Sequence, residues 1–175
     1  KLNEFYAHPN DINSHREQVK EREQFPIDRA LLTEALLTQY EAIGGANGKV
    51  LENINSLKEA KTFTVTTGHQ LNIFTGPLYF IYKIFHAIRL AEELQKAYPE
   101  HHLVPIYWMN SEDHDLVEVG HFNLFGKQYV WENPQTGATG RMRPDGLSEF
   151  CDQLDDVFAN NDGMKEILSV FRKAY

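Results

Sequence analysis

The sequence predicts an α/β protein whose core is a parallel β-sheet, and three observations carry this prediction. A β-branched run at Thr62–Thr67 is typical of a strand. A long amphipathic run at Leu78–Tyr98 is typical of a helix, and an apolar run at Leu103–Met109 is typical of a second strand. A strand, a helix and a strand at this spacing form a βαβ unit, so the two strands are expected to be parallel and adjacent, with a right-handed crossover.

An N-terminal helical segment, residues 1–60, is predicted to precede the α/β domain at residues 61–175. Asp11 or Asn13 is expected to cap its first helix at 14–24, because short polar side chains accept hydrogen bonds from the first free N–H groups of a helix.

Two more helices are expected before the first strand. Asp28 is a predicted cap for a helix at Arg29–Ile43, and a glycine-rich turn at 44–48 separates it from a third helix. This region has no pattern typical of a catalytic unit.

The long helix is expected to begin at an anion-binding turn. Gly68 allows a positive φ or a close approach to a ligand. Thr75 is a predicted N-cap, and Pro77 suits the first turn, where a missing N–H costs nothing. The N–H groups after Thr75 and Gly76 are expected to face a phosphate or carboxylate, which helix N-termini bind.

A short hairpin is expected after the second strand, formed by His121–Phe125 and Gln128–Trp131 with its turn at Gly126-Lys127. A loop at Asn133–Gly146 follows.

Two helices are expected at the C-terminal end. The first lies near Phe150–Phe158 and starts at Asp145 or Ser148. The second covers Met164–Tyr175, with Asp162 as its predicted cap.

The composition limits which partners and which cellular environment are expected for the protein. The formal net charge of -8 argues against a nucleic-acid partner, which would require a basic face. The single cysteine, Cys151, forms no internal disulfide and fits a reducing cytoplasm. No apolar run approaches the roughly 20 residues that span a membrane. Because the chain starts at Lys1 and stops inside an apparent helix, we expect a fragment of a longer protein.

Polar side chains follow both predicted strands. The first strand leads into Gly68–Gln70, and the second leads into Asn110–Asp115. In open parallel sheets ligands bind beyond the carboxyl ends of the strands, and adjacent strands bring their following loops to one rim. The sequence therefore predicts a small-molecule site formed by the two loops.

The first loop carries hydrogen-bond donors. His69 is expected to donate to a phosphoryl oxygen or to stabilise charge that develops during acyl activation. Gln70 and Thr75 can donate to the same ligand, and Lys83 is expected either to face the anion or to be solvated. The structural alternative is a tight turn with a buried, satisfied histidine.

The second loop crowds ionisable groups. Three carboxylates and an imidazole occupy four successive positions, Glu112, Asp113, His114 and Asp115. Such a cluster suits general base catalysis, amine recognition or Mg²⁺ binding. Asn110 is expected to line the same pocket. The structural alternative is an N-cap with a solvated acidic first turn, and no zinc site is expected.

Other candidates are weaker. Arg141 and Arg143 can clamp a carboxylate or phosphate, or be exposed. Cys151 is interpreted as a packing residue whose acidic neighbourhood raises the thiol pKa. No Gly-x-Gly-x-x-Gly motif is present, so a nicotinamide cofactor has little support.

Two motifs resemble the bacillithiol biosynthesis cysteine-adding enzyme family, and the resemblance is dense from Thr64 to Phe122. The motifs are Thr67-Gly68-His69-Gln70…Phe74-Thr75-Gly76-Pro77-Leu78-Tyr79…Ile81-Tyr82-Lys83 and Pro105…Trp108-Met109…Ser111-Glu112-Asp113-His114-Asp115…Glu118-Val119. One departure is His69, where many members have Gln; either side chain can donate a hydrogen bond.

The resemblance implies a Rossmann-like core related to class I aminoacyl-tRNA synthetases and nucleotidylyltransferases, of which this chain holds the first part. It also implies helical insertions, a coiled coil, a homodimer and a cytoplasmic location for the full-length protein. The implied ligase reaction joins cysteine to glucosaminyl malate. By analogy, Gly68–Gln70 matches the place where synthetase-like enzymes hold nucleotide phosphates, so ATP and Mg²⁺ are candidate cofactors, and the cofactor stays open.

Under this resemblance, Asp113 or Asp115 binds the amino group of cysteine or glucosamine, and His114 moves a proton. Three alternatives stay open. The chain can belong to another adenylate-forming ligase, such as a pantothenate synthetase-like enzyme or a nucleotidylyltransferase-like enzyme. It can be a non-catalytic nucleotide- or metabolite-binding module, or a helical assembly domain on an inert α/β core.

Overall fold

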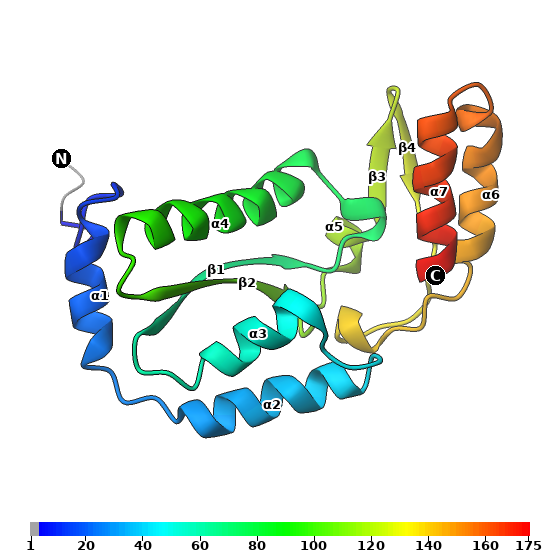
Figure 1. Ribbon diagram of the computed structural model, residues 1–175. Helices are drawn as coiled ribbons and strands as arrows, with labels where there is room; N and C mark the ends of the chain where they lie inside the picture. Colours follow the sequence, from blue (N-terminus) through cyan, green and yellow to red (C-terminus); the bar gives the residue numbers. More distant parts are fainter. Residues whose placement is uncertain (1–3) are drawn as a thin grey trace. The chain divides into compact units, whose positions relative to one another are not determined.

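A computed structural model describes residues 4–175, and Figure 1 labels its helices and strands. The helices are α1 (His15–Glu23), α2 (Arg29–Glu41), α3 (Gly48–Ser56), α4 (Leu78–Ala97), α5 (Leu116–Val119), α6 (Leu147–Phe158) and α7 (Asp162–Ala174). The strands are β1 (Thr62–Gln70), β2 (His102–Asn110), β3 (His121–Leu124) and β4 (Lys127–Val130). Two 3₁₀ turns lie at Ile73–Thr75 and Thr139–Arg141.

The α/β class and the parallel pairing are confirmed, because β1 and β2 form a two-stranded parallel sheet and α4 separates them in the chain. The predicted end of the first strand at Thr67 is wrong. The strand continues through Gly68 to Gln70, so Gly68 lies within a strand and not in a turn. A Cβ at Gly68 would lie 3.2 Å from both the Cβ and the carbonyl oxygen of Trp108, so this close approach favours glycine without a positive φ.

By packing, the chain divides into two compact units, whose bounds differ from the predicted division at residue 60. The first unit comprises the chain up to Thr67 together with Ile84–Ile106. The second comprises Gly68–Lys83 and Tyr107–Tyr175. Each unit therefore contains part of the β1–β2 sheet and part of α4.

The first unit has a hydrophobic core and three N-terminal helices, of which α2 and α3 pack together (Figure 1). The core is formed by Ala91, Leu94, Tyr98 and Leu103. The predicted cap of α2 is confirmed, since the Asp28 carboxylate accepts from the Leu31 N–H at 2.9 Å.

The start of α1 differs from the prediction. Ser14 occupies the N-cap position without a capping bond from its own side chain. Asp11 instead accepts from the Ser14 N–H at 3.0 Å and from its hydroxyl at 2.7 Å, which fixes the turn before the helix. Asn13 contributes no side-chain cap.

The start of α4 also differs, because Thr75 is not its N-cap. Phe74, Thr75 and Gly76 all have positive φ values, of 48°, 65° and 57°. Thr75 belongs to a 3₁₀ turn, and Pro77 directly precedes the first helical residue, Leu78. The Gly76 N–H donates to the Ile73 carbonyl at 2.9 Å, so it is not free for an anion.

The second unit contains an aromatic core beneath the predicted hairpin and the last two helices. β3 pairs antiparallel with β4, and Leu124 opposite Lys127 places the turn at Phe125-Gly126, one residue earlier than predicted. α6 and α7 lie side by side next to this hairpin (Figure 1). The core residues are Ile73, Phe74, Tyr129, Trp131, Leu147, Phe150, Cys151, Leu154, Phe158 and Leu168.

The caps of these helices correct two predictions. Gly146, with φ of 82°, occupies the N-cap position of α6, where Asp145 or Ser148 was expected. Asn161 caps α7 by accepting from the Met164 N–H, and Asp162 is the first helical residue.

Candidate functional site

An open pocket of about 420 Å³ lies at the carboxyl ends of β1 and β2, entirely within the second unit. It is called the polar pocket below. Its lining residues come from both predicted loops and from the first turns of α4: Gly68, His69, Gln70, Tyr79, Lys83, Trp108, Asn110 and Asp113. The predicted convergence of the two polar segments is therefore found.

His69 lines the pocket and is only 9% exposed. Its Nε2 lies 3.0 Å from the Tyr79 hydroxyl oxygen. Its Nδ1 lies 2.8 Å from the amide nitrogen of Asn72 and 3.3 Å from the Gln70 carbonyl oxygen. The ring of Phe80 packs edge-on against the imidazole. These polar contacts and the ring contact hold the imidazole in one orientation.

Asp113 also lines the pocket and is fixed by uncharged donors. Its Oδ2 accepts from the Gln70 amide at 3.2 Å and from the Asn110 amide at 3.4 Å, and its Oδ1 accepts from the Asp115 N–H at 2.8 Å. The same Gln70 amide donates to Glu118 at 3.1 Å. Neutral donors orient the carboxylate but leave its negative charge to attract a cationic group of a ligand.

Two backbone hydrogen bonds, called the backbone brace, hold the chain segment that carries Asp113. The Thr139 N–H donates to the Asp113 carbonyl at 2.7 Å, and the Gly140 N–H donates to the Ser111 carbonyl at 2.8 Å. A Cβ at Gly140 would lie only 2.4 Å from the Ser111 Cβ, so glycine permits this approach.

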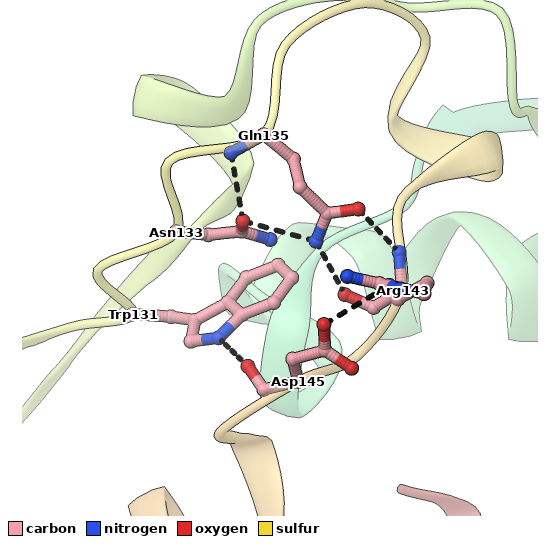
Figure 2. A network of polar contacts seen from close by, with 5 residues as sticks. All are labelled: Trp131, Asn133, Gln135, Arg143 and Asp145. Carbon is pink, nitrogen blue, oxygen red and sulfur yellow. Dashed lines mark hydrogen bonds and ion pairs between the residues drawn. The ribbon is translucent and has the colours of Figure 1, made fainter.

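The loop that carries this brace is closed by Gln135 (Figure 2). The Gln135 side-chain amide donates to the Arg143 carbonyl at 2.9 Å and accepts from the Arg143 N–H at 3.0 Å. Asn133 holds Gln135 through bonds to its backbone and side-chain N–H groups, and the Trp131 indole donates to the Asp145 carbonyl at 2.9 Å. This network fixes the two ends of the segment that positions Asp113.

Two side chains donate hydrogen bonds to backbone carbonyls near the C-terminal end of β1. Lys83 donates to the Gly68 carbonyl, and Tyr107 donates to the His69 carbonyl at 3.2 Å. Burial raises the pKa of the Tyr107 phenol above its usual range, so it remains a neutral donor. Because both carbonyls are engaged, side chains supply the free polar groups of the pocket.

Several predicted site residues do not line the pocket. Thr75 and Gly76 form the turn before α4, and His114 is exposed. Asp115 caps α5 by accepting from the Glu118 N–H at 3.1 Å, so this residue has a structural role, with the helix beginning at Leu116. Two exposed ion pairs lie outside the pocket lining: Arg141 with Glu112 at 3.4 Å, and Arg143 with Asp145 at 3.0 Å.

Cys151 is fully buried in the aromatic core, as its interpretation as a packing residue expects. Burial raises the pKa of its thiol, and the carboxylates of Asp152 and Asp155 add to the effect. Since the thiolate is the reactive form, this cysteine is not activated as a nucleophile.

The contributing residues that were not predicted include Asn72, Trp108, Glu118 and Gln135. Trp108 and Glu118 lie in the second family motif, which is the one sequence signal that marks them. Asn72 lies inside the first motif but has no typical pattern of its own. Gln135 carries no local signal, because its partner is a backbone segment eight residues away.

Among residues 4–175, no group of three His, Cys, Asp or Glu side chains is arranged to hold a metal ion. No helix of that range is both long and apolar enough to cross a membrane.

Comparisons with known proteins match the whole chain to one family. The family model described as "Bacillithiol biosynthesis BshC, N-terminal Rossmann-like domain" matches residues 1–175. Three similar relatives each bear the name "Putative cysteine ligase BshC". The relative from Cytophaga hutchinsonii is 44% identical over 79% of this chain and 26% of its own length. Those from Flavobacterium psychrophilum and Flavobacterium johnsoniae are 40% and 37% identical over 99% of this chain and 33% of their own lengths. The chain therefore spans about a quarter to a third of the length of these curated relatives.

Proposed function

The chain belongs to the family of bacillithiol biosynthesis BshC N-terminal Rossmann-like domains, and from this premise we propose that it is part of a ligase that joins cysteine to glucosaminyl malate. The relatives are named cysteine ligases, which supports the reaction class. The polar pocket is the proposed substrate site.

The observation that carries this proposal is the composition of the polar pocket. The lining presents donors from Tyr79 and Lys83 and also the Asp113 carboxylate. A carboxyl or phosphoryl oxygen fits the donors, and an ammonium group fits the carboxylate. An amino acid, or an amine next to an activated acyl group, offers both.

Amide formation requires the carboxyl group of cysteine to be activated before the amine of glucosaminyl malate attacks it. The amine attacks in its neutral form. Its nitrogen forms the new C–N bond, the acyl C–O bond to the activating group breaks so that this group leaves, and the nitrogen loses its extra proton to solvent. The donors Tyr79 and Lys83 stabilise negative charge on the acyl or phosphoryl oxygens, and Asp113 orients the amine by accepting a hydrogen bond from it. No step is assigned to His114, whose exposed side chain lies outside the lining.

The remaining expectations concern the full-length protein. We propose a cytoplasmic homodimer with a coiled-coil segment, with small molecules and not nucleic acid as its ligands. ATP with Mg²⁺ is the candidate activating cofactor. Lys83 is the cationic side chain that would face a phosphate, and Asp113 is the carboxylate of the lining.

The test substitutes His69→Ala and Asp113→Asn separately in the full-length protein and measures bacillithiol formation from cysteine and glucosaminyl malate. Asp113→Asn is expected to reduce turnover by about 100-fold or more, because it removes the charge that orients the amine. His69→Ala is expected to reduce turnover by about tenfold or more, because it removes the hydrogen bond to Tyr79. Asp156→Asn, on an exposed position of α6, removes a carboxylate away from the pocket and serves as the matched control. Near-normal turnover in both pocket variants would remove the proposed roles.

Melting shifts distinguish the alternatives. Stabilisation by cysteine and the sugar malate supports the ligase, since ligands that bind the folded state raise its apparent stability. A shift with nucleotide alone favours a non-catalytic nucleotide-binding module. Stabilisation by a different acid and amine pair favours another adenylate-forming ligase.

A further inference from the structure

Asn72 occupies a position that decides which nitrogen of His69 carries the proton. Its amide nitrogen lies 3.2 Å from the Gln70 carbonyl oxygen and 2.8 Å from His69 Nδ1. A carbonyl oxygen only accepts hydrogen bonds, so one N–H of the amide points to Gln70 and the other is directed at the imidazole. Nδ1 also lies 3.3 Å from the Gln70 carbonyl oxygen, a contact that a proton on Nδ1 would be needed to bridge. The contact with the Asn72 N–H is the shorter by 0.5 Å and the Gln70 carbonyl already accepts from Asn72, so Nδ1 accepts and the ring proton is on Nε2.

The proton on Nε2 determines the direction of the next hydrogen bond. His69 Nε2 lies 3.0 Å from the Tyr79 hydroxyl oxygen, so the imidazole donates and the tyrosine oxygen accepts. The hydroxyl hydrogen of Tyr79 is then free to point elsewhere, and no other hydrogen bond to this hydroxyl is found among residues 4–175. Tyr79 is 52% exposed whereas His69 is 9% exposed, so the tyrosine is the member of the pair that a ligand meets first.

Gly76 fixes the position of Asn72. A Cβ at Gly76 would lie 2.6 Å from both the Cβ and the Cγ of Asn72 and 2.8 Å from its Oδ1. Its φ of +57° also lies in the region that favours glycine. The backbone of this turn therefore packs directly against the Asn72 side chain and holds its nitrogen toward His69.

We infer that the chain Asn72–His69–Tyr79 is a directed donor relay in which the Tyr79 hydroxyl, and not the imidazole, donates to an anionic oxygen of the ligand. Asn72 and His69 are positioning residues that act through Tyr79. The inference rests on the proposed function for its substrate, a carboxyl or phosphoryl oxygen. The direction of the relay is a property of the protein without substrate and can be measured independently.

The first experiment reads the protonation site directly by ¹⁵N NMR of histidine-labelled full-length protein, with the His69 signals identified by their loss in His69→Gln. The wild type is expected to show the neutral form protonated at Nε2. Asn72→Asp replaces the donor with a carboxylate that only accepts, so the proton is expected to move to Nδ1. Asn123→Asp, on an exposed position of β3, adds the same charge without touching the imidazole and should leave the signals unchanged.

A wild-type imidazole protonated at Nδ1 would overturn the relay, even if Asn72→Asp fails to fold. An unchanged protonation site in folded Asn72→Asp would overturn the role of Asn72. Neither result depends on whether the protein makes bacillithiol, so failure of the relay and failure of the proposed function are distinguishable.

The second experiment compares Tyr79→Phe with Tyr82→Phe in the ligase assay. Tyr82 lies one turn later on α4, is 67% exposed and is not part of the pocket lining, which makes it a matched control. Loss of the ligand-donating hydroxyl is expected to lower kcat/KM by at least about tenfold, the value of one hydrogen bond to a charged group. Equal kcat/KM values for Tyr79→Phe, Tyr82→Phe and the wild type would overturn the assignment of Tyr79.

Discussion

A cavity in the first compact unit and the polar pocket in the second are of similar size and differ in chemistry. The first unit has a cavity of about 330 Å³, called the apolar cavity. It is lined mainly by apolar side chains such as Phe63, Leu90 and Leu94. The polar pocket of the second unit, about 420 Å³, is lined mainly by hydrogen-bonding groups. Size therefore does not identify the site, whereas convergent polar side chains do.

The charged groups of the two cavities also differ in their hydrogen-bond partners. In the apolar cavity, the Arg29 guanidinium donates to the carbonyls of Leu57, Ala60 and Thr62 at 2.9–3.2 Å, which ties α2 to the chain before β1. In the polar pocket, Asp113 is held by the side-chain amides of two other lining residues. The first arrangement stabilises the fold, and the second prepares a binding surface. The following variants test this contrast.

The largest expected effect is on stability and concerns the apolar cavity. Leu94→Ala removes a side chain that is 4% exposed and should lower the free energy of unfolding by about 2–5 kcal/mol. Thermal unfolding of the full-length protein measures this, and the KM values for both substrates should be unchanged. A stable variant with a raised KM would place substrate binding in the first unit and reverse the comparison.

The next largest effect is on turnover. Gln70→Glu removes the donor shared by Asp113 and Glu118 and places a third carboxylate beside them. Misplacement of the Asp113 carboxylate is expected to lower turnover by about 100-fold, equivalent to about 2.7 kcal/mol. Gln128→Glu, on an exposed position of β4, makes the same charge change away from the pocket. If both variants retain wild-type turnover, Gln70 does not position Asp113.

A smaller effect is expected from opening the loop that braces Asp113. Gln135→Leu leaves the exposed Arg143 N–H and carbonyl without their side-chain partner and, because water can replace it, should cost only about 0.5–1.5 kcal/mol of stability. The displaced brace should also lower turnover more than Gln128→Leu does at its exposed site. Unfolding curves and the ligase assay on both variants check this, and equal turnover would show that the loop is not needed for the site.

The smallest effect is a pH dependence in the aromatic core. Burial raises the pKa of Tyr175, and the hydrogen bond from the Phe74 N–H at 3.0 Å partly opposes this. Because the folded-state pKa lies above the unfolded value of about 10, the stabilising contribution is complete below about pH 10 and is lost as pH rises through the folded pKa. The melting temperature should therefore fall less between about pH 9 and about pH 11 in Tyr175→Phe than in the wild type. Tyr82→Phe, at an exposed position, should behave like the wild type. Identical profiles for all three proteins would contradict the buried titration.

The sequence predicted what local patterns and sheet topology determine. β-branched and apolar runs located both strands within three residues at each end, and parallel pairing then implied that Gln70 and Asp113 meet. The turn before α4 was missed because its conformation depends on distant residues. Phe74 adopts φ of 48°, which is unfavourable for a bulky residue, and packs against the rings of Phe122 and Phe171, which lie far along the chain.

The polar supports of the site were also hidden from the sequence. Asn72 and Gln135 are ordinary turn and loop residues by type, and their roles come from partners that only the folded chain brings within reach. His114, in contrast, was predicted from crowding in the chain, but the structure leaves its side chain exposed. Neighbouring positions in the sequence indicated a cluster of ionisable groups, whereas the parallel pairing of β1 and β2 determined which of these groups lines the pocket.

The location of the substrates tests the central claim most directly. A crystal structure of the full-length protein soaked with cysteine and glucosaminyl malate should show an anionic ligand oxygen within hydrogen-bonding distance of the Tyr79 hydroxyl. It should also show a ligand amine within the same distance of the Asp113 carboxylate. Substrates bound in the apolar cavity, or anywhere that leaves the polar pocket to solvent, would contradict the account.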